Sequence, residues 1–99
     1  MFGITVNGSN IYACTYGGGV FLSTNNGTSW SAVNTGLSNL YVWSIAVIGG
    51  NIFAATDGGG VYLSTNNGAS WSAVNNGLTN QYVWALVSNG TSLIAGTAN

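Results

Sequence analysis

The chain contains an internal repeat of 41 residues, which restricts its possible folds more than any other feature. The stretch Ser23–Trp30 recurs almost unchanged as Ser64–Trp71. Around it, residues 17–43 match residues 58–84 at 22 of 27 positions. A third, partial copy follows, so the 99 residues hold two repeats and 17 further residues (99 − 2 × 41 = 17). A period near 40 is typical of propeller blades and of solenoids built from paired helices.

Strands fit the repeat better than helices do. Each repeat has four short apolar runs rich in β-branched and aromatic residues, separated by Gly and Asn. In the second repeat we expect strands at about 44–48, 51–56, 60–64 and 70–74. The links between them include dipeptides such as Asn7-Gly8, which suit tight turns. No stretch keeps a 3.6-residue period, and each Gly inside a helix costs about 1 kcal/mol.

Each repeat is therefore predicted to form a four-stranded antiparallel meander, which is the blade of a β-propeller. The expected fold is all-β, with about two and a half blades in one repeat domain covering residues 1–99. Blade 1 is expected at about 2–43, blade 2 at about 44–84, and a half-blade at 85–99. Small residues in the second run of each repeat, such as Cys14 and the equivalent Ala55, let blades converge near a central axis.

The charge of the chain excludes several classes of function. Lys, Arg, His and Glu are absent, and Asp57 is the one charged side chain. A nucleic-acid partner is not expected, because phosphate binding depends on Lys and Arg. One Cys without any His cannot build a metal centre, and no cofactor is expected. No apolar run approaches the roughly 20 residues that span a bilayer. A net charge near zero favours self-association.

Two further expectations concern the state of the Cys14 thiol and the location of the protein. Cys14 occupies a position where the other repeats have Ala55 and Gly96, so a buried thiol is the favoured reading. An intermolecular disulfide or a reactive thiol is the alternative. Residues 1–15 lack the basic region of a signal peptide, although an extracellular or cell-surface location is expected.

The repeated eight-residue stretch resembles the Asp box, Ser-x-Asp-x-Gly-x-x-Trp, of the bacterial-neuraminidase-type (BNR) repeat. The matching residues are Ser23, Gly27 and Trp30 in the first copy, and Ser64, Gly68 and Trp71 in the second. Asn25 and Asn66 stand at the Asp position. The surrounding pattern is similar to that of bacterial sortilin-like and photosystem-assembly-type propellers. The resemblance implies that the box is a structural turn between the third and fourth strands, with its Trp packed into the blade core.

The same resemblance bears on catalysis. Some members of this family are glycosidases, and the sialidases among them need an Arg cluster and a Tyr–Glu pair. Other glycoside hydrolases need two carboxylates. This chain has no Arg, no Glu and one Asp. We therefore expect no enzymatic activity and no catalytic residues in this chain.

The candidate site is an aromatic face formed by the links between strands. The fourth link, 34–43, and its copy, 75–84, are expected beside the links at 16–19 and 57–60. The candidate ligand-binding residues are Tyr16, Tyr41, Trp43, Asp57, Tyr82 and Trp84, with amides from Asn39, Asn80 and Gln81 nearby. Flat rings beside such polar groups suit a sugar. Alternatively, Trp43 and Trp84 fill the gap between blades and Asp57 is a turn residue.

Closure of the propeller leaves several readings open. Propellers usually have about 4–8 blades, so the chain is expected to form a homo-oligomer, with three or four copies favoured and a filament possible. The segment 85–99 exchanges strands with a neighbour or stacks as an incomplete blade. The favoured function is a non-enzymatic binding scaffold with a glycan ligand. One alternative is a purely structural protein, namely a closed ring, a filament subunit, or an excised or designed propeller fragment. The other is a protein-binding scaffold.

Overall fold

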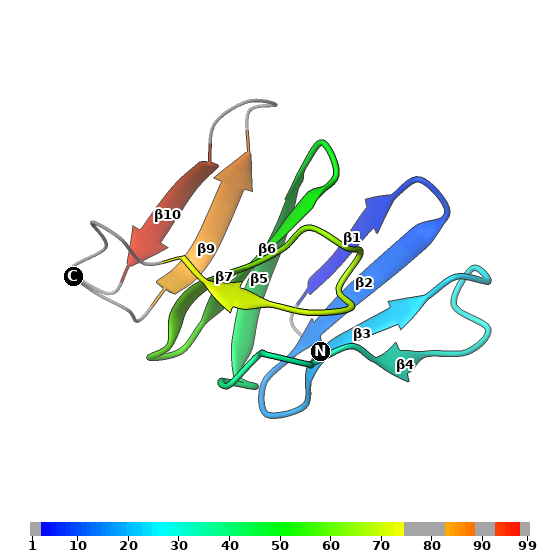
Figure 1. Cartoon of the computed structure of the whole chain (residues 1–99), viewed down its shortest axis with the longest axis horizontal. Helices are drawn as coiled ribbons and strands as arrows, with labels where there is room; N and C mark the ends of the chain where they lie inside the picture. The colour runs from blue at the N-terminus through cyan, green and yellow to red at the C-terminus, as the bar shows by residue number, and fades with distance from the viewer. Residues whose placement is uncertain (1–2, 75–82, 89–92, 98–99) are drawn as a thin grey trace.

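The part of the chain that the structure describes forms two four-stranded antiparallel sheets and a two-stranded hairpin (Figure 1). The computed structural model describes residues 3–74, 83–88 and 93–97, and of the last two ranges it describes the backbone alone. The expected all-β fold built from propeller blades is confirmed by these sheets, because each is a meander in which strands pair in sequence order. Within the described ranges, no helix is long and apolar enough to cross a membrane.

The strands follow the 41-residue period. Blade 1 consists of β1 (Gly3–Asn7), β2 (Asn10–Thr15), β3 (Gly19–Ser23) and β4 (Ser31–Ala32). Blade 2 consists of β5 (Val42–Ile48), β6 (Asn51–Thr56), β7 (Gly60–Ser64) and β8 (Ser72–Ala73). The hairpin consists of β9 (Val83–Ser88) and β10 (Leu93–Thr97).

Two strand limits differ from the expected ones. β5 begins at Val42 rather than at 44, because Val42 pairs with Thr56 beyond an irregularity in the ladder. β8 covers only residues 72–73 instead of 70–74. The backbone N–H of Trp71 donates to the carbonyl of Thr35, in the link that follows blade 1, at 2.9 Å. This residue is therefore bonded to the neighbouring blade rather than to its own sheet.

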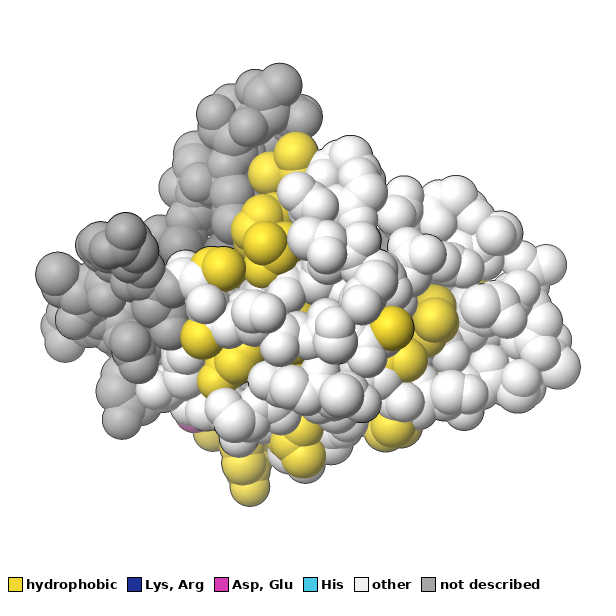
Figure 2. Space-filling model, in the orientation of Figure 1, with side chains coloured by type: hydrophobic (Ala, Val, Ile, Leu, Met, Phe, Trp, Pro, Cys, Tyr) yellow, Lys and Arg dark blue, Asp and Glu magenta, His cyan; other side chains and the backbone are white. Residues whose placement is uncertain are grey.

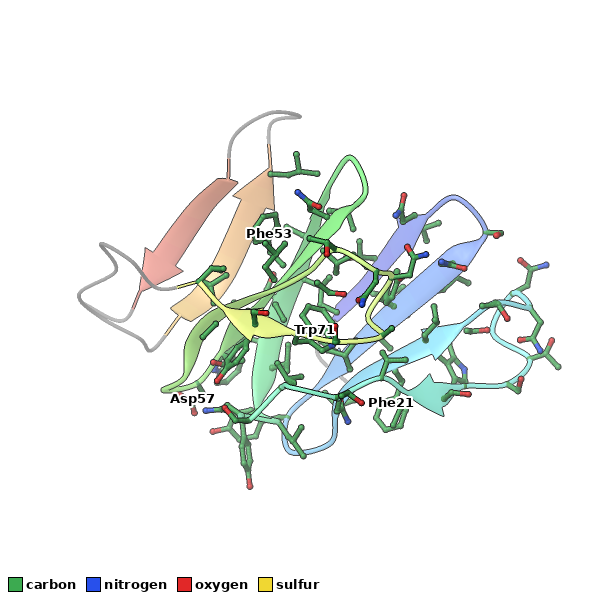
Figure 3. The ribbon with its side chains drawn as sticks, in the orientation of Figure 1. Phe21, Phe53, Asp57 and Trp71 are labelled. Carbon is green, nitrogen blue, oxygen red and sulfur yellow. The ribbon has the colours of Figure 1, made fainter. Side chains whose placement is uncertain are left out.

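The hydrophobic core lies between the two blades. Tyr12, Cys14 and Val20 of blade 1 pack in one cluster with Ile52, Ala54, Tyr62 and Trp71 of blade 2. Figure 3 shows Trp71 in the space between the two sheets. The Tyr12 hydroxyl donates to the backbone oxygen of Asn67 at 3.1 Å, so even the polar end of this side chain is bonded across the interface. Cys14 is fully buried, in agreement with the small apolar slot that the repeat predicts.

The Asp-box turn is held by the Asn that replaces Asp. In blade 2, Asn66 Oδ1 accepts from the Ser64 hydroxyl at 2.9 Å and from the Ser70 N–H at 3.0 Å. The Ser64 hydroxyl in turn accepts from the Gly68 N–H at 2.8 Å. Asn67 has φ 61°, a left-handed conformation that Asn tolerates. The same bonds recur at 2.8–3.0 Å around Asn25 in blade 1. An amide oxygen thus accepts these bonds without a charge.

The prediction that both box tryptophans lie in the core is wrong for Trp30. Trp71 is 5% exposed, whereas Trp30 is 40% exposed. The Trp71 indole N–H donates to the backbone oxygen of Val33 at 2.7 Å, and Val33 follows blade 1. A box Trp is therefore buried by the preceding blade and not by its own. Among the described residues, no blade precedes blade 1, so Trp30 remains at the surface.

Candidate functional site

One link organises the candidate site. The segment that follows blade 1 runs past the β2–β3 turn and is bonded to it. The carbonyl of Leu40 accepts from the N–H groups of Gly17 and Gly19, both at 2.9 Å. Tyr16 and Tyr41 form an isolated antiparallel bridge beside these bonds. The link is thus fixed against the end of blade 1, and the two tyrosines are brought together from positions far apart in the sequence.

The β6–β7 turn of blade 2 is attached to the same link. The N–H of Asp57 donates to the carbonyl of Tyr41 at 2.9 Å. The Asn39 side-chain amide donates to the carbonyl of Asp57 at 2.9 Å, and its oxygen accepts from the N–H of Tyr41 at 2.9 Å. Asn39, which the sequence suggested as a ligand-binding amide, therefore bonds backbone with both of its polar atoms. Its role here is to hold the two blade ends together.

Three aromatic side chains gather at this junction. The Tyr16 and Tyr41 rings pack edge to face, with centroids 4.6 Å apart and planes at 74°. Tyr16 also contacts Trp43, with centroids 4.9 Å apart and planes at 47°. Both tyrosines are exposed and Trp43 is half-buried. We name Tyr16, Tyr41, Trp43 and Asp57 the aromatic face.

Trp43 reaches this face through an irregularity in its strand. Val42 pairs with Thr56 and Ser44 pairs with Ala55, so Trp43 is an extra residue in the ladder. A bulge of this kind re-aims the side chain it carries. The extra residue accounts for a Trp at the start of an inner strand that packs beside Tyr16. Half-buried Trp43 thus packs at the junction, while its role in ligand binding stays a prediction.

The charge of the chain is located in the same place. The Tyr16 hydroxyl donates to Asp57 Oδ2 at 2.6 Å. This hydrogen bond to the carboxylate raises the pKa of Tyr16 above its ordinary value, with smaller contributions from desolvation and from charge. Tyr16 and Asp57 are equivalent positions of successive repeats, so the bond joins the ends of adjacent blades. Figure 3 shows Asp57 near the β6–β7 turn.

Asn34 supports the site, and sequence reasoning missed it. Its side-chain oxygen accepts from the Val20 N–H at 2.8 Å, and its amide donates to the carbonyl of Gly18 at 3.1 Å. A Cβ at Gly19 would overlap the Asn34 side chain, and Gly19 has φ 80°. The signal available in the sequence was the recurrence of Asn34 as Asn75 within the copied segment.

The structure brings together four of the six candidate residues, namely those of the aromatic face. Tyr82, Asn80 and Gln81 lie outside the described residues, and only the backbone of Trp84, in β9, is described. In the described ranges, no three His, Cys, Asp or Glu side chains gather as metal ligands. The view in Figure 2 shows scattered apolar groups and no basic side chain. The aromatic face therefore presents three aromatic rings, two phenol hydroxyls and one carboxylate.

Comparison with known proteins supports the fold. No protein-family model matches the chain, and no curated protein matches it significantly. The crystal structure of an ancestral GH74 enzyme is similar, with a TM-score of 0.80 and 28% sequence identity. The match covers 97% of this chain and 13% of the enzyme's chain. The chain thus resembles a short propeller fragment of that enzyme, which agrees with the blades described above.

Proposed function

We propose that this protein is a non-enzymatic, self-associating propeller module that binds a glycan on the aromatic face. The observation that carries the proposal is the exposed Tyr16–Tyr41 pair next to Asp57, the one charged side chain of the chain. Sugar rings present CH groups that stack on aromatic rings, and hydroxyls that donate to carboxylates. A carboxylate with one oxygen held by a phenol still offers its other oxygen to a sugar hydroxyl.

We propose no catalytic activity, because the chain has one acidic side chain. Glycoside hydrolysis uses a pair of Asp or Glu side chains on opposite sides of the scissile bond. Asp57 has no acidic counterpart anywhere in the sequence. The similar GH74 structure is an enzyme, but this chain corresponds to 13% of it. Binding without turnover is therefore the function that the residues of the aromatic face favour.

The proposal is tested by screening the purified chain on a glycan array and measuring the dissociation constant of each hit by calorimetry. Tyr41→Ala removes a ring from the face and is expected to weaken binding by at least about fivefold, if stacking of a sugar matches the roughly 1–3 kcal/mol that a nucleic-acid base gains on one aromatic ring. Tyr41→Phe keeps the ring and is expected to bind nearly as the parent does.

A matched control separates a specific site from general stickiness. Trp30→Ala removes a comparably exposed aromatic side chain outside the aromatic face. Its affinity per site for the glycan is expected to equal that of the parent chain. No hit on the array, or hits that Tyr41→Ala and Trp30→Ala weaken equally, would show that the aromatic face is not a glycan site. A protein ligand would then be the next candidate.

A further inference from the structure

Blade 1 carries an apolar face on the side away from blade 2. Thr5 donates its hydroxyl to the Ile45 carbonyl of blade 2, so its neighbours in β1 point the other way. Tyr12 in β2 faces blade 2 in the same manner, and Val20 in β3 belongs to the shared core. Side chains alternate in direction along β1, β2 and β3, so the residues that point away from blade 2 can be identified. Together with the exposed Trp of the box, they form the apolar face. Its members, here called the leading face, are Ile4, Val6, Ile11, Phe21 and Trp30.

Each member of the leading face has a counterpart in blade 2 that is buried or half-buried. The counterparts, 41 residues further on, are Ile45, Val47, Ile52, Tyr62 and Trp71, and all of them belong to the core between the blades or pack against it. Ile4 is 54% exposed and Ile45 is 9% exposed. Gly27 of the box turn is half-buried, whereas its counterpart Gly68 is buried. Equivalent residues thus differ in exposure because blade 1 covers one set.

The part of blade 1 that covers Trp71 also has a counterpart in the second repeat. Val33 accepts the indole N–H of Trp71 and lies 3.2 Å from the position of a Cβ on Gly68. Its own N–H donates to Val20 at 2.9 Å. Val74 is the counterpart of Val33, and its N–H donates to Val61 at 2.9 Å in the same way. Val74 is one of the exposed large apolar residues. Val74 therefore has the same backbone bond to its own sheet that Val33 has.

We propose that the leading face of one copy of this chain docks on blade 2 of a second copy, where Val74 lies. The Trp30 indole N–H donates to the Val74 carbonyl of the second copy, as Trp71 donates to Val33 within one chain. This inference deepens the self-association in the proposed function and rests on it. The two surfaces are different, so the contact is head-to-tail and adds copies in one direction.

One element competes for the docking surface. β9 lies against β5 and β6 of its own copy, in the place that β1 of a docked copy would take. Figure 1 shows the hairpin β9–β10 at one end of the molecule and blade 1 at the other. The hairpin is two-stranded, and because a two-stranded hairpin alone is only marginally stable, its stability depends on the contact with β5 and β6. β1 and β2 belong to a four-stranded sheet that buries Tyr12. The proposed contact therefore requires blade 1 of the docked copy to replace the hairpin.

The experiment uses two single variants of the full chain and their mixture. Trp30→Ala removes the anchor of the leading face, and Val74→Asp places a charge on the receiving surface. Each is expected to weaken self-association, measured by sedimentation, by about 30-fold or more, the usual loss for an interface anchor. Near-ultraviolet circular dichroism confirms that the variants fold. Tyr41→Ala, on the aromatic face, is expected to associate as the parent chain does.

Mixing the two variants tests the head-to-tail geometry. Trp30→Ala copies keep the receiving surface and Val74→Asp copies keep the leading face, so the mixture is expected to form a one-to-one dimer that grows no further. A monomeric mixture from an associating parent chain would overturn the proposal. If both variants associate as the parent chain does, the proposal is also overturned, and self-association must then use another surface. If the parent chain stays monomeric, the prediction of self-association is wrong. Glycan binding is measured per site in a separate experiment, so that part of the proposed function is tested independently.

Discussion

At the scale of single residues, equivalent positions have acquired different partners. Tyr16 and Asp57 occupy the same place in successive repeats, and the substitution of one for the other creates a phenol–carboxylate bond of 2.6 Å between blade ends. Tyr12 and Phe53 also correspond, and only Tyr12 has a hydroxyl to bond the following box turn. The sequence shows these differences, but their meaning depends on which neighbour each side chain meets.

The Tyr16–Asp57 bond gives a prediction for pH dependence. Because the bond raises the pKa of Tyr16, Asp57→Asn is expected to lower that pKa toward the ordinary value of about 10. A raised folded pKa adds stability that is complete below the unfolded pKa and is lost as pH rises through the folded one. The Asp57→Asn variant should therefore lose less stability than the parent chain does in strongly alkaline solution.

The measurement is a nuclear magnetic resonance titration of the Tyr16 ring in both proteins. Tyr12 provides an internal control, since burial and not Asp57 raises its pKa. The pKa of Tyr12 should be the same in the parent and in the variant. An unchanged pKa of Tyr16 in Asp57→Asn would contradict the bond.

At the scale of elements, the link after blade 1 adds backbone hydrogen bonds to the packing of strands that joins the two blades. The link after blade 1 bonds the β2–β3 turn, the β6–β7 turn and the backbone of Trp71. Gly36 lies where this link passes the box turn of blade 2, with φ 84°, and a Cβ there would overlap the backbone oxygen of Trp71. Glycine is required at this point by both the backbone conformation and the approach of another backbone.

Substitution at Gly36 separates these two requirements. Gly36→Ala is expected to lower the free energy of unfolding by about 3 kcal/mol or more, combining left-handed strain of roughly 1–2 kcal/mol with overpacking. Gly8→Ala is the matched control, because Gly8 has φ 63° with open space around it. Gly8→Ala should lower the free energy of unfolding by the left-handed strain alone. Urea denaturation of both variants measures the difference, and equal losses would mean that the link does not approach Trp71 closely.

At the scale of the whole molecule, a nearly uncharged surface has apolar faces at the blade ends. The formal net charge is −1. Among residues 3–74, the exposed large apolar residues belong to three places: Ile4, Val6 and Trp30 on the leading face, Tyr16 and Tyr41 on the aromatic face, and Val74 on blade 2. Contacts between copies through the leading face would thus depend on apolar burial and hydrogen bonds.

Self-association is therefore predicted to be insensitive to sodium chloride. The Debye length falls from about 30 Å to about 8 Å between low and physiological ionic strength, and association that depends on charge weakens strongly over this range. Here the dissociation constant should change by less than about twofold, and association should show a negative heat-capacity change. Sedimentation at several salt concentrations and calorimetry at several temperatures measure both. A steep salt dependence would point to the Asp57 carboxylate at the contact.

The sequence by itself determined the blade and its period. Turn dipeptides, β-branched runs and the box residues determine the conformation of the chain next to them. The four strands of a blade and the turns at Asn25 and Asn66 can therefore be predicted from local sequence. The gathering of Tyr16, Tyr41 and Trp43 was also foreseeable, because the meander brings their links to one edge.

Only the tertiary structure decided what each repeat buries. Trp30 and Trp71 stand in nearly identical local sequence, yet one is exposed and the other is in the core, because burial depends on the adjacent blade. The bonds of Asn39 and Asn34, and the bulge at Trp43, likewise depend on segments far away in the chain. A repeat encodes its own strands, but its faces acquire their roles from whatever packs beside them.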